Sequence, residues 1–398
     1  MPDILGVRTT INLLASEDPQ DFIEGIGWLY PKGYTNAPLM ALISTLPRES
    51  TSNRVINHYE EGFPTMTVTV ASTVAASGAT SITTSETGGA LITRLFTQLR
   101  NERTGEIFLA TADGSGQTIT IADAYRAFST TIAAIMSAGD TLTVIGSATP
   151  EAYTSPTPQS SKPTLVTNYT QEIRESFALS NIVADSSLRT GNQYSNDHFR
   201  ALSRWATKAE NAFFWSELAT ATDTGGTTNY AMRGLSATIT TNVDTINGLI
   251  SQNTIKTHLK NVFKYGNQQK ICFCGNDFLQ AWMDIIEAKP GMQIRVVPGE
   301  DKFGLGFTEY MVPYGTVFIK PSPLFNANPA WIGHAFFLDV PNLTYRYFIN
   351  NDLDLHENIL TDNRPTYRKD EFAGIISLET WFEQTHSKIL GVTGWSGN

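Results

Sequence analysis

The amino-acid sequence predicts an α+β chain that also carries a small β-barrel or sandwich domain. Three observations predict this class. An alternating polar strand over residues 167–179 leads into one long helix that begins at Asn196 and ends near Leu218. Short alternating strands separated by glycine turns fill residues 66–148. Helical and strand patterns then alternate over residues 236–335, and strands joined by turns occupy the last part of the chain.

The long helix has a clear start, one apolar face and a stop. The side chain of Ser195 or Asn196 can accept a hydrogen bond from the first free backbone amides, which is the role of an N-cap. Gly225 and Gly226 follow the helix and prevent its continuation. Apolar residues recur at three- and four-residue steps along it. They are Phe199, Leu202, Ala206, Ala209 and Phe213.

A basic stripe lies on the same helix. Arg200, Arg204 and Lys208 recur at four-residue steps and therefore share one face. One interpretation is a solvated helix face, which needs no further function. The other is a surface that contacts the phosphates of a nucleic acid without sequence preference.

Residues 1–65 read as an arm with short helices, and residues 66–152 read as an inserted β-rich domain. Residues 153–163 are rich in Pro, Ser and Thr, so we expect an extended linker there. The apolar segment 38–46 does not present enough of a regular apolar face to fold alone. We expect five strands in the β-rich domain. They cover residues 67–70, 79–83, 106–110, 118–121 and 141–145.

The α/β region is expected to contain two helices, over residues 254–265 and from Asn276 onward, with Gly266 as the C-cap of the first. Strands are predicted between and after them. Their expected ranges are 270–274, 293–297, 316–320, 335–340, 344–349 and 374–382.

Composition limits the classes of function. The 398 residues can form two or three domains with a real core. Charged residues make up 17% of the chain, below the ~25% of ordinary soluble domains. A surface poor in charge suits large areas buried between subunits, because few charges then lose their water. A secreted or β-rich protein would have a similar composition.

Charge, cysteines and apolar runs exclude several classes. The net charge of −10 gives the chain no overall basic footprint for reading nucleic-acid sequence. Cys272 and Cys274 share one face of a predicted strand and cannot form a disulfide framework, which favours synthesis in a reducing compartment. The N-terminus does not read as a signal peptide, and no run of ~18 apolar residues predicts a membrane span.

The sequence predicts no enzyme, cofactor or metal site. The Gly-x-Gly of residues 303–307 lacks a third glycine and a following helix, and the six histidines are scattered. No serine nucleophile motif or other catalytic constellation is recognisable. The acid pairs Asp352/Asp354 and Asp370/Glu371 suit glycoside hydrolysis in principle. Surface acids at the ends of strands explain them equally well.

Several segments, in this order along most of the chain, resemble the major head proteins of tailed bacteriophages with the Hong Kong 97 (HK-97-like) capsid fold. The strand and helix of residues 167–218 resemble that family's extended-loop strand and spine helix. Six further segments resemble its arm, loop entry, axial strand and closing strands. They are residues 36–44, 58–65, 270–275, 310–316, 337–343 and 379–390.

The resemblance implies a domain plan. It assigns residues 1–65 to an N-terminal arm, 66–152 to a β-domain inserted at the extended loop, and 153–194 to the linker and extended-loop strand. Residues 195–235 become the spine helix of the peripheral domain, 236–335 the axial domain, and 336–398 peripheral strands and the C-terminus. Segment 38–46 is then expected to lie against other parts of the shell.

The implied function is that of a structural subunit, made in the host cytoplasm and located in the virion. Copies would form pentamers and hexamers of an icosahedral head around double-stranded DNA, with scaffolding, portal and decoration proteins as further partners and no membrane. The strand of residues 167–179 would lie over an adjacent subunit. Its expected contact residues are Tyr169, Glu172, Arg174, Glu175 and Phe177, and Arg200, Arg204 and Lys208 would face packaged DNA.

Two other classes remain open from the sequence. The β-domain of residues 66–148 resembles the binding modules of virion surfaces, which suits an adhesion or tail-associated protein. Low charge and richness in Ser and Thr suit a secreted hydrolase. The order of arm, strand, spine helix and α/β region favours the capsid subunit over both.

Overall fold

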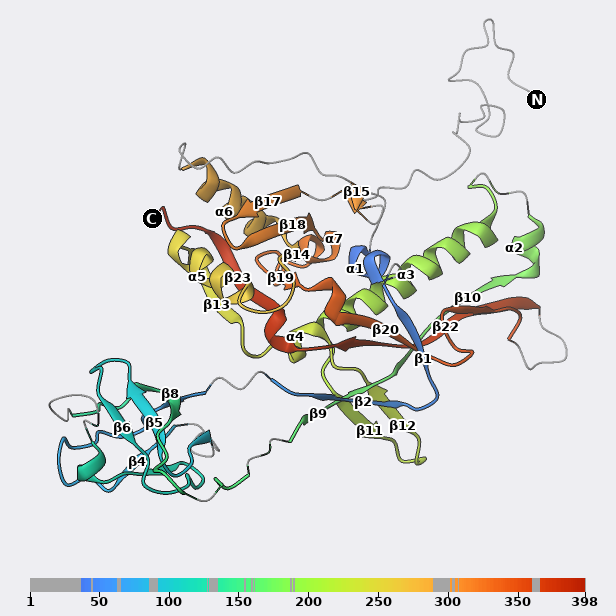
Figure 1. Ribbon diagram of the computed structural model, residues 1–398. Coiled ribbons are helices and arrows are strands. Elements are labelled where there is room, and N and C mark those ends of the chain that lie inside the picture. Colours follow the sequence, from blue (N-terminus) through green and yellow to red (C-terminus); the bar gives the residue numbers. More distant parts are fainter. Residues whose placement is uncertain are drawn as a thin grey trace, which may run out of the picture. The chain divides into compact units, whose positions relative to one another are not determined.

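The chain divides into two compact units, seen in a computed structural model (Figure 1). The main unit combines Met1–His58 with Val166–Asn398, and the second unit spans Tyr59–Leu165. The predicted β-rich domain, 66–152, falls inside the second unit. The structure describes residues 37–43, 46–62, 66–85, 92–126, 128, 135–153, 155–158, 160, 162–186, 188, 190–288, 301–302, 305–306, 308–359 and 366–397. The turn or short helix expected over residues 20–26 of the arm and the strand expected over residues 293–297 lie outside these residues.

The main unit holds two sheets. The five-stranded sheet has the order β1-β20-β22-β10, with β21 also paired to β22. β1 runs parallel to β20, and the other pairs are antiparallel. Its strands are β1 (Arg48–Thr51), β10 (Gln171–Ser180), β20 (Leu343–Phe348), β21 (Asp354–His356) and β22 (Tyr367–Thr380).

The six-stranded sheet has the order β13-β23-β19-β14-β18-β17 and mixes parallel with antiparallel pairs. Its strands are β13 (Val243–Ile250), β14 (Gln269–Cys274), β17 (Thr308–Val312), β18 (Gly315–Pro321), β19 (Ala335–Leu338) and β23 (Ser387–Trp395). Among the described residues, three two-stranded pairs belong wholly or partly to this unit. They are β2 (Val55–Glu60) with β9 (Thr164–Tyr169), β11 (Ala219–Thr222) with β12 (Thr228–Ala231), and β15 (Asp301–Lys302) with β16 (Leu305–Gly306). The first of them crosses into the second unit, since β2 continues beyond His58 and β9 begins before Val166.

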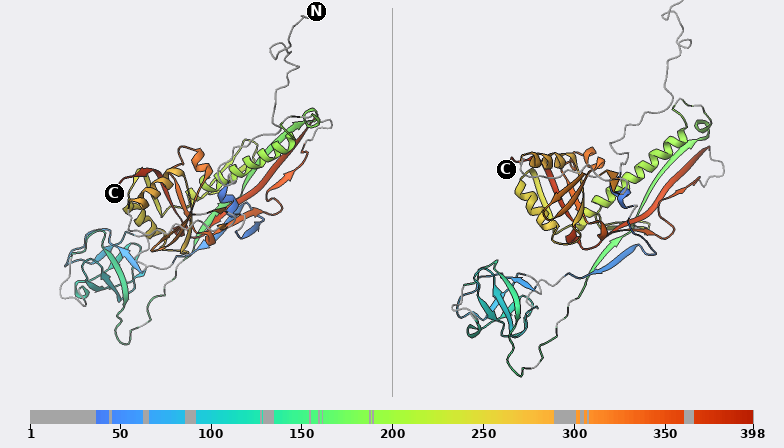
Figure 2. Two further views of the ribbon diagram at one scale, coloured as in Figure 1. Left: turned by 90° about the horizontal axis from the view of Figure 1, so that it is seen from above. Right: turned by 45° about the horizontal axis from the view of Figure 1, so that its top comes forward.

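The helices of the main unit pack on these sheets. Figures 1 and 2 show α3 running along the sheet at β10 and β22. The helices are α1 (Pro38–Ile43), α2 (Asn181–Asp185), α3 (Gln193–Trp215), α4 (Leu235–Thr238), α5 (Gln252–Val262), α6 (Asn276–Glu287) and α7 (Pro323–Ala327). Short 3₁₀ turns cover Val340–Asn342 and Glu383–Thr385.

The long helix is confirmed, but it begins earlier than predicted. The N-cap is Asn192, whose side-chain oxygen accepts from the Ser195 amide at 3.3 Å, and not Ser195 or Asn196. The buried stripe is also rotated from the predicted one. Its largest member is Trp205, and Phe199 is exposed. The fully buried apolar residues of α3 are Ala201, Trp205, Ala209, Ala212, Phe213 and Phe214.

The predicted stop of the helix is wrong. Gly225 and Gly226 form the turn between β11 and β12, where Gly226 has a φ of +82°. The helix ends at Trp215, where the chain turns back closely at Gly234. The Gly234 amide donates to the Ser216 carbonyl at 2.7 Å, and a Cβ at Gly234 would lie 2.8 Å from the Ala212 carbonyl oxygen.

Trp205 is the anchor of α3 on the five-stranded sheet. Its indole Nε1 donates to the Ile173 carbonyl of β10 at 3.0 Å. The ring lies over Gly374 of β22, where a Cβ would come within 2.8 Å of the ring. Any larger residue at position 374 would therefore push the helix away from the sheet.

The apolar arm segment packs inside its own chain. Leu39, Leu42 and Ile43 of α1 are buried in the same core cluster as α3. Glu210, fully buried on α3, accepts from the Leu39 and Met40 amides at 2.9 and 2.7 Å. Segment 38–43 therefore does not need another part of a shell to cover it, contrary to the expectation.

The six-stranded sheet has a core on each face. Ile271 and Phe273 of β14 face the cluster around the end of α3, while Cys272 and Cys274 face α5 and α6. Both cysteines are free and buried, and they share one face of the strand as the sequence predicted. Burial raises the pKa of the Cys272 thiol well above its usual value.

A buried ion pair holds four segments of this region together. Lys270 Nζ lies 2.8 Å from Asp339 Oδ2 and donates to the carbonyls of Thr385 and Tyr265 at 2.9 and 3.2 Å. Burial lowers the pKa of Lys270, against the effect of Asp339. The expected closing strand of residues 379–390 is broken here. β22 ends at Thr380, and Phe382 has a φ of +50° before β23 begins.

The second unit is a small β domain with its own core. The sheet order is β3-β8-β5-β6, beside the pair β4-β7. Its elements are β3 (Thr67–Thr69), β4 (Ser81–Thr83), β5 (Thr97–Asn101), β6 (Ile107–Leu109), β7 (Thr118–Thr120), β8 (Thr141–Ser147) and a 3₁₀ turn (Asp123–Tyr125). The five predicted strands are present, and β5 was not predicted. A buried pair, Arg126 with Glu106 at 2.6 Å, ties this core together.

We predict that Glu210→Gln destabilises the subunit and flattens its pH dependence. The amide can accept only one of the two α1 bonds, which costs roughly 1–3 kcal/mol. Burial raises the pKa of Glu210 from its usual 4.5 to about 8. The folded chain therefore holds this proton more tightly than the unfolded chain. This contribution to the free energy of unfolding is complete below a pH of about 4.5. It is lost as the pH rises through about 8.

The measurement is urea unfolding of unassembled subunits across this pH range. The free energy of unfolding of the native chain should fall relative to that of the Glu210→Gln variant as the pH rises. Parallel profiles for the two chains would contradict the prediction.

We also predict that Lys270→Met costs roughly 3–5 kcal/mol, because it leaves the Asp339 carboxylate buried without its cation. The double variant Lys270→Met/Asp339→Asn removes both charges and should recover part of that loss. Thermal unfolding of the two variants and the native chain provides the check. Equal losses in the single and double variants would show that the ion pair is not the source of the effect.

Candidate assembly interface

The predicted strand of residues 167–179 is two strands that meet at Thr170. Residues up to Tyr169 belong to β9, which pairs with β2, and those from Gln171 onward belong to β10. The Thr170 amide donates to the Arg54 carbonyl at 2.9 Å between them. β10 pairs with β22 along all ten of its residues, so most of the predicted free strand belongs to its own sheet.

β10 nevertheless presents one open edge. In the order β1-β20-β22-β10 it is the last strand, and no described strand pairs with its outer side. An edge of this length is a template for pairing with another chain. β2 and β9 form a ribbon of only two strands, so both of their outer edges are open among the described residues.

Tyr169 and Glu172 mark the junction between ribbon and sheet. The half-buried Tyr169 ring packs edge-on against Tyr230, with ring centroids 5.4 Å apart. Glu172 lies 3.3 Å from Arg54 Nη2 and accepts from Arg174 Nε at 2.7 Å. Arg174 is well exposed, so these pairs each contribute only ~0–1 kcal/mol to the subunit.

Glu175 is paired with the basic stripe of α3. Its two carboxylate oxygens bond Arg204 Nε and Lys208 Nζ. Burial raises the pKa of Glu175, but the bonds from Lys208 and Arg204 outweigh it and lower the pKa overall. The structure thus joins Glu175, which was expected to contact another subunit, to the basic stripe of α3, which was expected to face DNA. Arg200 pairs with Asp197 at 3.0 Å, one helical turn away.

Phe177 is a core residue. It is buried between β10 and α3 among Tyr194, His198 and Phe372, with ring centroids 5.6, 6.0 and 6.3 Å away. These contacts lie within its own chain. The expected inter-subunit role of Phe177 therefore conflicts with its burial.

Asp370 was expected to be a surface acid, and it is buried instead. It accepts from Tyr194 Oη at 2.7 Å and from Arg368 Nε at 2.9 Å. Burial raises the pKa of Asp370, but the bonds from Arg368, the Asn358 amide and Tyr194 outweigh it and lower the pKa. Asp352 likewise accepts from Tyr345 Oη at 2.7 Å. One member of each expected acid pair is thus engaged within the sheet of its own chain.

A chain of three residues matches the hydrogen-bond order of a serine hydrolase, which the sequence did not reveal. His258 Nε2 lies 2.9 Å from Ser387 Oγ, and His258 Nδ1 lies 2.6 Å from Asp244 Oδ2. His258 lowers the pKa of Asp244. Ser387 is completely buried, so no substrate carbonyl can reach its oxygen. The arrangement connects α5, β13 and β23 and explains why this histidine lies in a core.

Exposed apolar side chains gather around α2, at the end of β10. Ile182 is 81% exposed, and Val183, Leu188 and Tyr367 are also exposed. Large exposed apolar patches are typical of interaction surfaces in proteins. Sequence periodicity did not single it out, because a helix of five residues is too short to show a pattern.

Among the described residues, no three His, Cys, Asp or Glu side chains gather as metal ligands would. None of the helices in the described part of the chain has the length and apolarity that crossing a membrane requires.

Comparison with known proteins identifies the family. Residues 17–393 match the family described as the SU10 major capsid protein. The curated major capsid protein of Pseudomonas phage PaMx41 is 28% identical over 330 residues, covering 78% of this chain and 75% of the relative.

Two solved structures are also similar to this chain. The capsid asymmetric unit of cyanophage A-1(L) has a TM-score of 0.45 at 13% identity, covering 97% of this chain and 98% of that one. The holo-SrpI encapsulin complex of Synechococcus elongatus PCC 7942 has a TM-score of 0.41 at 12% identity, covering 59% and 77%. Since the family match spans nearly the whole sequence, the chain belongs to the SU10 major capsid protein family and is a structural subunit of a phage capsid shell.

Proposed function

We propose that copies of this chain form pentamers and hexamers that close into an icosahedral head around double-stranded DNA, with an HK-97-like arrangement of domains. The observation that carries the proposal is the two-stranded ribbon of β2 and β9. A two-stranded ribbon is at best marginally stable in water. Tyr59 and Leu165 on this ribbon are 66% and 50% exposed. A neighbouring copy would cover these side chains and pair with the open edges.

The domain roles follow from this arrangement. The β2–β9 ribbon acts as the extended loop, and the second unit is the domain inserted in it. The five-stranded sheet with α3 acts as the peripheral domain, and the six-stranded sheet with α5 and α6 acts as the axial domain. The segment expected to be the extended-loop strand is thereby reassigned, from β10 to β9.

The proposed subunit contact includes three members of the expected set that are partly or well exposed. Tyr169, Glu172 and Arg174 lie at the base of the ribbon and on the edge strand, within reach of an adjacent copy. Glu175 serves mainly to hold α3 on β10, and Phe177 stays in its own core. Because exposed ion pairs stabilise little, the shell depends on apolar and backbone contacts of the ~2,000–5,000 Å² size found in permanent assemblies.

Contact with packaged DNA is the second part of the proposal. Arg200, Arg204 and Lys208 are each partly exposed on one face of α3. Glu175 and Asp197 offset two of these three positive charges. The stripe is therefore suited to weak phosphate contact without sequence preference, repeated in every copy of the shell.

The experiment that tests assembly is negative-stain microscopy with sedimentation velocity on the chain expressed alone. We expect rings of five and six subunits or closed shells. A chain that remains monomeric, even when it is co-expressed with the other head proteins of its phage, would overturn the proposal.

The double variant Tyr59→Asp/Leu165→Asp serves as the interface test in the same assay. Charges on the ribbon should prevent rings and shells while leaving the thermal unfolding of the subunit unchanged. Ile145→Asp, at a similarly exposed apolar position on β8, is the matched control. Assembly of the double variant at the level of the control would show that the ribbon is not a subunit contact.

We predict that Arg204→Gln/Lys208→Gln leaves empty shells intact and lowers their DNA content. Glutamine avoids the repulsion from Glu175 that a reversed charge would create. The measurement is the ratio of absorbance at 260 and 280 nm for purified heads from a complemented infection. Glu175→Gln is the converse control, because it removes the carboxylate that pairs with Arg204 and Lys208. It should not reduce the DNA content of the heads. Normal genome content in the double variant would contradict the DNA contact.

A further inference from the structure

The hairpin of β11 and β12 presents an open strand edge on the main unit (Figure 1). Among the described residues, these two strands pair only with each other. All four residues of β11 are exposed, whereas three of the four residues of β12 are partly buried. The outer edge of β11 is therefore the side of the hairpin that another strand can reach.

Contacts within its own chain fix the base of this hairpin. The amide oxygen of Gln171 accepts from Ser216 Oγ at 3.3 Å, just before β11, and from the Met232 amide at 3.2 Å, just after β12. The Arg54 guanidinium lies over the Tyr230 ring, with Cζ 5.5 Å from the ring centroid. β12 is thus held against the main unit, and β11 is presented in a defined position.

The edge strand carries no charge and none of the usual devices that protect a strand edge. Asp223 is the only charged residue between Glu217 and Arg233. Its Oδ1 is engaged in the turn, where it accepts from the Gly225 and Thr227 amides at 2.8 and 3.0 Å. Edge strands are usually protected by lysine, proline or a bulge. β11 has the sequence Ala-Thr-Ala-Thr in regular register with β12, so its edge is suited to pairing with another strand.

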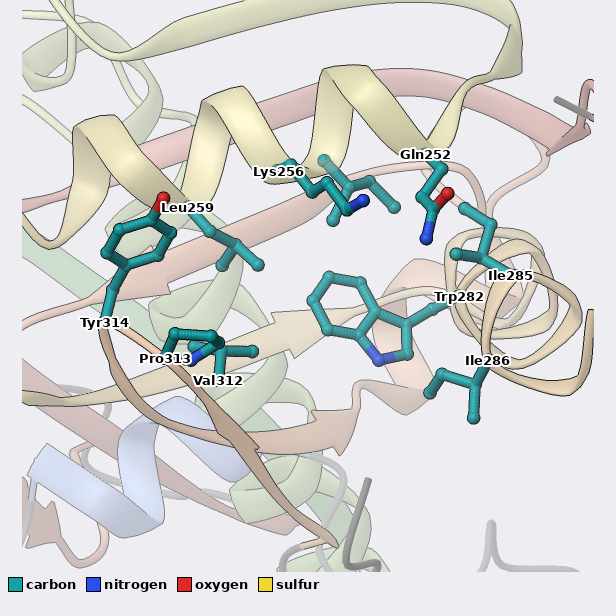
Figure 3. Close-up of a pocket in the computed structure, with 10 residues that line it drawn as sticks. Gln252, Lys256, Leu259, Trp282, Ile285, Ile286, Val312, Pro313 and Tyr314 are labelled. Atoms are coloured by element: carbon teal, nitrogen blue, oxygen red, sulfur yellow. The ribbon is translucent and has the colours of Figure 1, made fainter. Parts of the chain in front are cut away.

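Other surfaces of the main unit are less suited to contact with an identical surface. Three other edge strands carry charge, with Arg174 on β10, Asp244 on β13 and Glu309 on β17. Lys256 of α5 lines the apolar pocket beside Trp282 (Figure 3). When two identical surfaces meet around a two-fold axis, a charge near the axis lies close to its own copy. Like charges repel there, whereas the β11 edge brings none.

We infer that β11 pairs antiparallel with β11 of a second copy around a two-fold axis, and so joins neighbouring rings of the shell. The inference rests on the proposed function, because a closed icosahedral shell has two-fold axes between its rings. Two copies of one strand satisfy each other's N–H and C=O groups when they run antiparallel. The two hairpins then form one four-stranded sheet, which is more stable than an isolated two-stranded hairpin.

Charges placed on β11 test the inference, with sedimentation velocity and negative-stain microscopy to separate rings from closed shells. Ala221→Lys and Ala221→Glu each bring like charges together across the proposed axis. We expect each variant to form rings normally but to need about tenfold more subunit to close shells. An equal mixture of the two variants should close shells more readily than either variant alone, because opposite charges then face each other in the mixed contacts.

Asn229→Lys is the matched control. Asn229 is exposed and lies opposite Ala221 in the hairpin, one strand farther from the open edge. This variant should close shells at nearly the concentration that the native chain needs. The melting temperature of the free subunit should be unchanged in all of these variants, because both positions are exposed, and thermal unfolding checks that each variant keeps its fold.

The outcomes distinguish failure of the β11 contact from failure of the proposed function. If the native chain forms no rings or shells, the proposed function fails. If native shells close and both Ala221 variants close as readily, or if these variants also prevent rings, the β11 contact alone is overturned. A mixture that closes no better than either variant alone would show that β11 does not face a second β11, and would overturn the inference as well.

Discussion

The seating of α3 on the five-stranded sheet is the contact on which the rest of the main unit depends. Trp205 lies over Gly374 and bonds the Ile173 carbonyl, so the helix is fixed both to β22 and to β10. That position brings Arg204 and Lys208 to Glu175 and buries Phe177 beneath the helix. It also points Glu210 at the first amides of α1, so the arm is held from the opposite side of the same helix.

Buried polar groups form the hydrogen bonds that connect segments far apart in the sequence. Glu210 joins α1 to α3, Lys270 joins β14 to the loops beside β19 and β23, and His258 joins α5 to β13 and β23. Each of these groups loses water on folding and regains hydrogen bonds only when the segments meet in one arrangement. Apolar contacts provide most of the stability, while these bonds favour a single arrangement of the segments.

Sequence periodicity predicted the elements that carry a long pattern. The long helix, α5, α6, β14, β18 and the strands of the second unit were found within a few residues, because each buries one face against a core. The end of α3 was not predicted, because it depends on the close approach of the chain at Gly234. β5 was not predicted, because its pattern of alternating residues includes the polar side chains of Arg100 and Asn101.

The residues of the candidate interface were harder to predict than the fold. Phe177 and Asp370 were both placed at the surface, yet tertiary neighbours bury them. The pairing of Glu175 with the basic stripe depends on contacts between residues about thirty positions apart.

The open edge of β10 has a consequence for the life of the subunit before it meets its neighbours. A newly made chain exposes the unpaired outer edge of β10 and a two-stranded ribbon with apolar side chains. Open strand edges and exposed apolar surface are the features through which proteins aggregate. The same surfaces allow orderly growth and disordered precipitation, and the local concentration of subunits decides between them. Assembly therefore competes with aggregation for the same strand edge and the same apolar side chains.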